Sequence, residues 1–230
     1  SRSTQQGVFV MGFVTASAPG KCILFGEHAV VYGHPAVAVA IDQRISVKIQ
    51  PSPNRLWLLD GSSLIMNRNP HIRGLIEKLW PQQYGAPALS IHIKGNIPRA
   101  SGLGSSAALS VATAAALRMA RGRFVSKTGG TQQQYWLEGF GSTITKSEPY
   151  DNSPGFLAPE SSAERYHITG KSSVDIDECA ILAHSVEAAA QQGRASPMDS
   201  STCSHGGIVI ISDVIEQGID SVSYTHLTLP

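Results

Sequence analysis

The feature that most constrains the fold is a long alanine-rich segment placed directly after a glycine-rich one. Residues Ser105–Ala120 contain no Gly or Pro, and alanine is the strongest helix former, so a helix is predicted there. Just before it, Gly102 and Gly104 carry no side chain, which allows tight turns and close approach of the backbone to a ligand. Apolar and polar residues alternate over Leu89–Ile93, which predicts a half-buried strand. The order strand, glycine loop, helix follows.

Such a loop is suited to binding phosphate groups. Free N–H groups at the start of the helix, together with its dipole, favour an anion, and a triphosphate fits this site. Ser105 and Ser106 add hydroxyl oxygens that suit phosphate contacts and Mg²⁺. The loop has neither the lysine of a Walker motif nor the GxGxxG spacing of a dinucleotide-binding fold. Taken alone, it could also be a Gly/Ser turn that only caps the helix.

Composition indicates a globular protein without a strongly charged partner. Of the 230 residues, 42% are hydrophobic and 15% are charged, the formal net charge is +1, and no Lys/Arg run occurs. No apolar stretch approaches the roughly 20 residues that cross a bilayer, so we expect neither nucleic acid nor a membrane as a partner. Three widely spaced cysteines form no CxxC pair, which favours reduced thiols and a cytoplasmic location.

The remaining elements follow from periodicity and turn residues. Helical spacing of apolar residues predicts a helix over Asn69–Trp80, and a capping-box-like start at Asp175 predicts another that reaches about Gln192. A loop is expected over Arg194–His205. Strands are predicted at Phe13–Ser17, Lys21–Phe25, Ile45–Ile49 and Gly207–Ile211.

Three segments stand apart from these elements. Residues 122–173 are rich in Gly, Ser, Thr, Pro and Gln without a sustained period, which indicates an insertion, a mobile cover or a poorly ordered segment. Residues 1–10 precede Met11 and are interpreted as an upstream extension. Residues 222–230 continue no pattern and are interpreted as a non-native tail, so they are left out of the fold prediction.

Three motifs, in this order along the chain, resemble those of the GHMP kinases. The block SAPGKCILFGEHAVVYG at Ser17–Gly33 resembles the opening motif of the mevalonate kinase branch almost residue for residue. Pro98–Ala108, of the form PxxxGLGSSAA, resembles the phosphate loop of the whole family. GRASPMD at Gly193–Asp199 is similar to the catalytic-aspartate loop in the form found in archaeal members. The resemblance implies an α+β GHMP kinase fold over residues 11–211, with a ribosomal protein S5 domain 2-like N-terminal domain.

The resemblance also implies roles for single residues. Asp199 would be the catalytic carboxylate, and Lys21 would lie near the reacting hydroxyl and phosphate. Ser106 and Glu187 would hold Mg²⁺, although Glu187 lies one residue further from Gly193 than the family spacing. Residues lining the substrate and nucleotide pocket would be Lys21, Glu27, His28 and Ser196. The nucleotide phosphates would be bound by Pro98, Ser101, Gly102, Leu103, Gly104, Ser105, Ser106 and Ala107.

Each of these residues also has a plainer interpretation when taken alone. Lys21 could be a surface lysine, Asp199 a loop aspartate or helix cap, and Glu187 part of a solvated helix face. His28 could be a buried histidine bonded to the backbone. His184 and His205 are expected to be structural, since no Cys/His/carboxylate cluster has metal-ligand spacing. The joint occurrence of the three motifs favours the functional interpretation of Lys21 and Asp199.

The activity implied by the resemblance is transfer of phosphate from ATP, with Mg²⁺, to the alcohol mevalonate in isoprenoid biosynthesis. The alternatives are a phosphomevalonate kinase, another GHMP small-alcohol kinase, or a non-catalytic nucleotide-binding fragment. GHMP kinases carry a second domain with a further glycine-rich motif, and none follows Asp199 here. We therefore expect the C-terminal domain to be largely missing, and a homodimer is left open.

Overall fold

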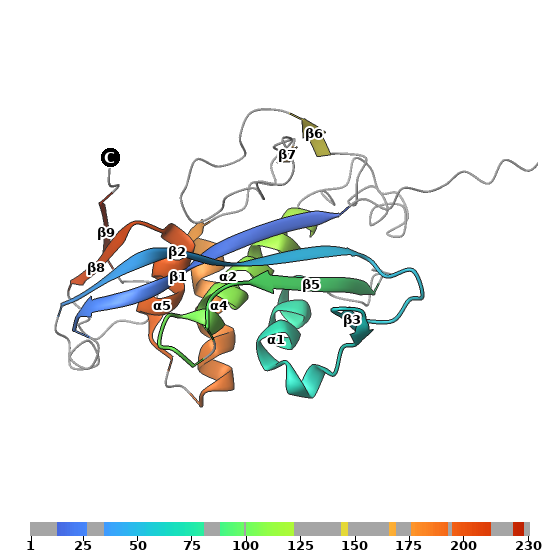
Figure 1. Cartoon of the computed structure of the whole chain (residues 1–230), viewed down its shortest axis with the longest axis horizontal. Coiled ribbons are helices and arrows are strands. Elements are labelled where there is room, and N and C mark those ends of the chain that lie inside the picture. The colour runs from blue at the N-terminus through green and yellow to red at the C-terminus, as the bar shows by residue number, and fades with distance from the viewer. Residues whose placement is uncertain are drawn as a thin grey trace, which may run out of the picture.

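The computed structural model describes residues 13–26, 35–80, 88–98, 100–121, 144–146, 166–168, 176–192, 195–212 and 223–227. In this part of the chain seven strands form a mixed sheet, two further strands form a separate pair, and helices pack against one face of the larger sheet (Figure 1). The α+β arrangement expected from the sequence is confirmed.

Strand β2 (Ala36–Pro51) is the centre of this sheet. Along one edge it pairs antiparallel with β1 (Val14–Phe25). Along its other edge it pairs antiparallel first with β8 (Ile208–Ser212) and then with β5 (Leu89–Gly95). The elements that leave β5 and enter β8 therefore meet beside the middle of β2, close to β1.

The outer strands are short. Beyond β5 lie β3 (Leu58–Leu59), parallel to β5, and β4 (Ser62–Ser63), antiparallel to β3. Beyond β8 lies β9 (Ser223–Leu227), antiparallel to β8. Five of residues 222–230, which the fold prediction left out, thus pair with β8. Their non-native origin stays a prediction.

Two strands predicted separately are a single one. The sequence predicted a break between Ser17 and Lys21, but β1 runs through Pro19 and Gly20 with a register shift between Pro19 and Lys21. Proline is tolerated at this irregularity because the ladder hydrogen bonds are interrupted there.

The three predicted helices are confirmed to within two residues at each end. They are α1 (Pro70–Leu79), α2 (Ser105–Arg121) and α4 (Ile176–Ala190), and a 3₁₀ turn, η2 (Met66–Arg68), precedes α1. Within residues 122–173, the structure describes the strands β6 (Ile144–Lys146) and β7 (Tyr166–Ile168), which pair antiparallel. The predicted insertion otherwise lies outside the described residues.

A fourth helix, α5 (Pro197–His205), replaces most of the predicted loop Arg194–His205. Ser196 is its N-cap, and its side chain accepts a hydrogen bond from the Met198 N–H at 3.2 Å. Pro197 occupies the first helical position, where its missing N–H costs nothing. Gly206, with φ of 72°, ends the helix. These capping residues are visible in the sequence, and the loop prediction overlooked them.

Helix α2 is enclosed on nearly all sides, because it contacts β1, β2, α1, α4 and α5. A helix surrounded in this way must be apolar all round rather than amphipathic. Small side chains let each neighbour approach closely, which explains the alanine content. Its buried residues are Ala107, Ala108, Ser110, Val111, Ala112, Thr113, Ala114, Ala115, Ala116 and Leu117.

Helices α2 and α4 run antiparallel. At one end Ser106 interacts with Glu187, and at the other the Arg118 Nε atom donates a hydrogen bond to Glu178 Oε2 at 2.8 Å. The start of α2 is thus held beside the end of α4, where the candidate site residues lie.

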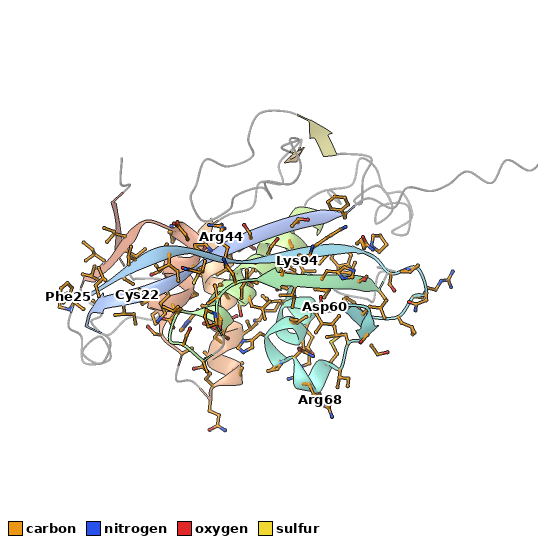
Figure 2. The ribbon with its side chains drawn as sticks, in the orientation of Figure 1. Cys22, Phe25, Arg44, Asp60, Arg68 and Lys94 are labelled. Carbon is orange, nitrogen blue, oxygen red and sulfur yellow. The ribbon has the colours of Figure 1, made fainter. Side chains whose placement is uncertain are left out.

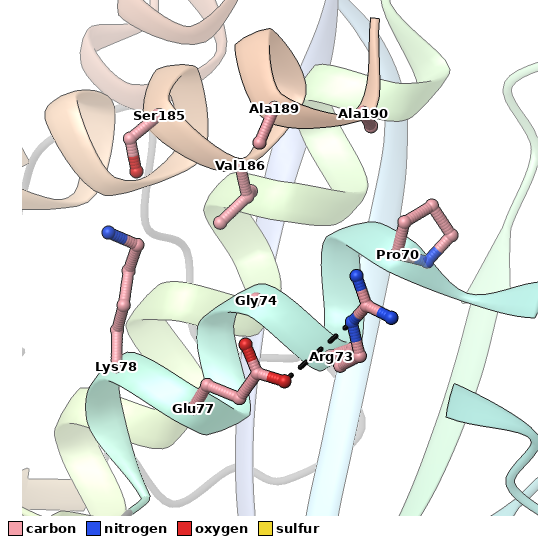
Figure 3. A pocket seen from close by; sticks show the side chains of 9 residues that line it. All are labelled: Pro70, Arg73, Gly74, Glu77, Lys78, Ser185, Val186, Ala189 and Ala190. Carbon is pink, nitrogen blue, oxygen red and sulfur yellow. Dashed lines mark ion pairs between the residues drawn. The ribbon is translucent and has the colours of Figure 1, made fainter. Parts of the chain in front are cut away.

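Gly74 brings α1 and α4 together. A Cβ atom at this position would lie 2.8 Å from Val186 Cγ1. Figure 3 shows Val186 of α4 pointing at Gly74 of α1 beside a groove of about 350 Å³ between the two helices. His71, one turn before Gly74 on α1, and Glu187, which follows Val186 on α4, are therefore held close to the start of α2.

We expect Gly74→Ala to lower the free energy of unfolding by roughly 1 kcal/mol. Alanine favours the helix, but overpacking against a stiff β-branched side chain costs more than this gain. Urea unfolding of Gly74→Ala, Val186→Ala and the double variant measures the effect. Because Val186→Ala makes room for the new methyl group, the double variant should be less destabilised than the sum of the two single ones. Additive losses would contradict the predicted contact.

Candidate active site

The glycine loop lies against β1 because two glycines let the backbones touch. A Cβ atom on Gly20 would lie 2.6 Å from the Leu103 carbonyl oxygen, and the Lys21 N–H donates a hydrogen bond to that same oxygen at 2.9 Å. Gly104 has a φ of 72°, and a Cβ atom there would lie 2.7 Å from Lys21 Cγ. The loop therefore fixes both the backbone and the side chain of Lys21.

Arg44 of β2 hydrogen-bonds to Ser17, which lies just before this contact on β1. Its Nε atom donates to Ser17 Oγ and its Nη2 atom to the Ser17 carbonyl oxygen, both at 3.1 Å. Figure 2 labels Arg44 in the middle of the sheet, where β2 passes β1. Since Ser17 lies just before the irregularity in β1, these bonds position the Pro19–Lys21 segment.

Lys21 forms an ion pair with Asp199. The Lys21 Nζ atom lies 2.9 Å from Asp199 Oδ1, and the exposed fractions of the two side chains are 5% and 29%. A buried ammonium group needs such a partner, because its removal from water is otherwise very costly. Asp199 lies in the first turn of α5, whose Ser196–Pro197 cap sets the direction in which the helix begins. The Asp199 side chain remains partly exposed, so a substrate could reach it.

Ser106, Glu187 and His71 meet at the start of α2. Ser106 Oγ lies 3.3 Å from His71 Nε2, and the hydroxyl group also interacts with the Glu187 carboxylate. Glu187 is only 3% exposed. The predicted pair of Ser106 and Glu187 is thus brought together, whereas nothing in the sequence linked His71 to it.

The electrostatics of Glu187 follow from its surroundings. Burial raises its pKa from 4.5 to about 7, and the nearby negative charge of Asp199 acts in the same direction, while Ser106 and Lys21 act in the opposite one. Such a carboxylate lacks a full counter-charge, since Lys21 is paired with Asp199. A divalent cation would supply that charge, and carboxylate and hydroxyl oxygens are the ligands that Mg²⁺ prefers.

The residues present therefore fit a cation held by Ser106 and Glu187. In the described part of the chain, no three His, Cys, Asp or Glu side chains gather as a metal-binding group. Two protein ligands are enough for Mg²⁺, which usually keeps water and phosphate oxygens in its remaining positions.

Cys203 lies beneath the glycine loop. Its Sγ atom is 3.9 Å from the Gly104 carbonyl oxygen, and the side chain is fully buried. Burial, followed by the negative charges of Asp199 and Glu187, raises the pKa of the thiol well above its usual value. The protonated thiol acts as a small core group that supports the loop.

The other predicted site residues have more varied places. The Ser101 hydroxyl donates to the Pro98 carbonyl oxygen at 2.8 Å within the loop. Ala107 is buried in the core, so only its backbone is available to a phosphate. Ser196 uses its side chain to cap α5. Glu27 and His28 lie outside the described residues. Two histidines expected to be structural also have neighbours here: His184 interacts with the Ser196 backbone, and His205 Nε2 lies 3.0 Å from Asp177 Oδ1.

We expect Glu187→Gln to remove a pH dependence of stability. Because the folded state raises the Glu187 pKa from 4.5 to about 7, folding takes up a proton between these values, and the free energy of unfolding falls as pH rises through this window. The total fall is on the order of 3 kcal/mol. Urea unfolding from pH 4 to 8 should show a flatter profile for Glu187→Gln than for the native chain. Glu77→Gln, at an exposed carboxylate, is the matched control; a profile unchanged by both substitutions would rule out the shift.

Comparisons with known proteins agree with this geometry. Residues 71–137 match the family described as GHMP kinases N terminal domain. The chain is 32% identical over 200 residues to the mevalonate kinase of Methanothermobacter thermautotrophicus, covering 86% of this chain and 50% of that protein. It is 47% identical over 104 residues to the mevalonate kinase of Archaeoglobus fulgidus, covering 44% of this chain and 36% of that protein. The chain thus spans half or less of the length of these relatives.

Solved structures show the same fold. The Methanococcus jannaschii mevalonate kinase superimposes with a TM-score of 0.57 at 23% identity, covering 93% of this chain and 55% of that one. A D-glycero-D-manno-heptose 1-phosphate kinase superimposes with a TM-score of 0.58 at 15% identity, covering 94% and 60%. Among the described residues, no helix is both long and apolar enough to cross a membrane. The glycine loop, the order of the elements and these similarities together show that the chain carries a GHMP kinase N-terminal domain and has the GHMP kinase fold.

Proposed function

We propose that this protein is a mevalonate kinase-type phosphotransferase, which moves the γ-phosphoryl group of ATP to the hydroxyl group of mevalonate. The observation that carries the proposal is the ion pair between Lys21 and Asp199 beside the glycine loop. The choice of mevalonate over another alcohol is supported by the relatives named mevalonate kinase at 32% and 47% identity.

The glycine loop is suited to hold the triphosphate. The N–H of Ala108 makes the first α-helical bond of α2, to the Gly104 carbonyl oxygen at 2.9 Å. The N–H groups of the preceding residues lie at the positive end of the helix dipole and can bind phosphate oxygens. A Cβ atom added to Gly102 would meet no described residue beyond its two chain neighbours within 4 Å, so the described part of the loop has open space where a ligand could lie.

Asp199 is proposed to accept the proton of the substrate hydroxyl group. As this proton leaves, the hydroxyl oxygen bonds to the γ-phosphorus, the bond from that phosphorus to the β–γ bridging oxygen breaks, and ADP departs with the electron pair. Lys21, held 2.9 Å from Asp199, can stabilise the negative charge of the transferring group.

Ser106 and Glu187 are proposed to hold Mg²⁺. When bound, the ion would neutralise charge on the phosphate oxygens and align them for transfer. Glu187 then needs to be ionised, which a cation favours by replacing the proton that burial retains near pH 7.

The test is release of ADP by the purified chain with ATP, Mg²⁺ and mevalonate. We expect mevalonate-dependent ADP release, with a rate that falls by roughly 10²–10⁴-fold in Asp199→Asn. The amide keeps the shape of the side chain but cannot accept the proton. Asp199→Ala should lose activity to a similar degree. Substitution of Asp42, an exposed aspartate of β2, by Asn should leave the rate unchanged.

The same assay separates the alternatives. Competition between mevalonate and phosphomevalonate identifies the acceptor, since the pocket must favour either a hydroxyl end or a phosphate end. Nucleotide binding without turnover of any alcohol would identify the chain as a non-catalytic nucleotide-binding fragment, and would refute the proposed activity for this chain.

A further inference from the structure

His71 lies at the candidate metal pair although it belongs to a different element from either ligand. It is the second residue of α1, its Nε2 atom is 3.3 Å from Ser106 Oγ, and the ring is partly buried. The close packing of Gly74 on Val186 holds α1 against α4, and both His71 and Glu187 reach the Ser106 hydroxyl group. Three helices therefore contribute one polar side chain each to a single contact.

The available hydrogens decide which atom donates. A neutral histidine ring carries a single N–H hydrogen, and Ser106 has a single hydroxyl hydrogen. The His71 Nδ1 atom is shielded from solvent and has no hydrogen-bond partner among the described residues. A hydrogen on Nδ1 would then make no hydrogen bond. The Ser106 hydroxyl would have to donate to Nε2 and would lose its hydrogen bond to Glu187.

A hydrogen on Nε2 uses both donors. His71 Nε2–H then donates to Ser106 Oγ, and the Ser106 hydroxyl donates to the ionised Glu187 carboxylate. This arrangement forms two hydrogen bonds instead of one and leaves no buried N–H unpaired, which is the costlier defect. It also leaves one Ser106 lone pair unused, in a direction fixed by the other two interactions.

We propose that His71 is a positioning residue, which donates from Nε2 to Ser106 Oγ and so aims the free oxygen lone pair of Ser106 at the Mg²⁺ that accompanies the nucleotide. The histidine acts on the metal through Ser106 and touches neither substrate nor nucleotide. The proposal rests on nucleotide binding at the Gly102–Ser106 loop, which is part of the proposed function, and does not require phosphoryl transfer.

The experiment measures the Mg²⁺ concentration that gives half-maximal binding of a fluorescent ATP analogue, mant-ATP, to the full chain. In His71→Gln the side-chain amide can reach the place of Nε2 and keep a donor there. In His71→Asn, which is one methylene shorter, the amide reaches only the place of Nδ1. His71→Leu removes all hydrogen bonding but keeps an apolar side chain of similar bulk.

We expect His71→Gln to need about the same Mg²⁺ concentration as the native chain, and His71→Asn and His71→Leu to need roughly 3–10-fold more, the value of one hydrogen bond. Binding of mant-ATP in EDTA should be equal in all four proteins, because His71 does not touch the nucleotide. Thermal unfolding of each variant shows whether α1 remains packed, and equal melting temperatures for Gln and Asn would assign the difference between them to the donor position.

Two kinds of result would overturn the proposal. One is an unchanged Mg²⁺ requirement in His71→Leu. The other would show that only the packing of the ring matters: the Mg²⁺ requirement rises equally in His71→Gln and His71→Leu, or the variants lose mant-ATP affinity equally with and without Mg²⁺. If the native chain itself binds no mant-ATP in Mg²⁺, the nucleotide site of the proposed function fails, and the role of His71 fails with it. That outcome differs from the first two, in which the native chain binds.

Discussion

The burial of one lysine ammonium group is the constraint on which the site depends. Lys21 is almost inaccessible to water, and a charge in that position destabilises the fold unless a carboxylate lies beside it. Asp199 provides the carboxylate from a helix that lies far along the chain from β1. The glycines at positions 20 and 104 allow the loop to close over the lysine, and the Ser196–Pro197 cap aims the aspartate at it. Folding of the sheet, the loop and α5 is therefore coupled through one ion pair.

Local signals in the sequence were sufficient where one element determines its own structure. The alanine-rich composition of α2 and the apolar spacing of α1 correctly located both helices, and the family motifs singled out Lys21 and Asp199, whose side chains lie 2.9 Å apart. The short helix α5 could also have been predicted, since Ser196, Pro197 and Gly206 are ordinary helix-boundary residues. Its polar composition, with no apolar stripe, favoured a loop instead.

Other features depend on contacts that no local pattern encodes. Pro19 and Gly20 ordinarily signal the end of a strand, yet β1 continues through them because β2 pairs with it on both sides of the irregularity. The one-residue departure of Glu187 from the family spacing cast doubt on its role, but the helix carries this side chain to Ser106 all the same. His71 follows a proline at the start of a helix, and the packing of α1 on both α2 and α4 brings it to Ser106. Such residues are found by tertiary structure alone.

The antiparallel packing of α2 and α4 places the candidate site residues at one end of the helix pair and the segment that connects the two helices at the other. Ser106 and Glu187 share one end of the helix pair, and the segment joining Arg121 to Ile176 starts and finishes at the other end, beyond the Arg118–Glu178 ion pair. The rise of an α-helix places that end about 20 Å from Ser106. Replacements, deletions or added residues in this connection can therefore accumulate during evolution while the two helix ends that carry Ser106 and Glu187 keep their geometry. The same place in the chain is where a tag or a reporter domain can be inserted with the least effect on the phosphate loop.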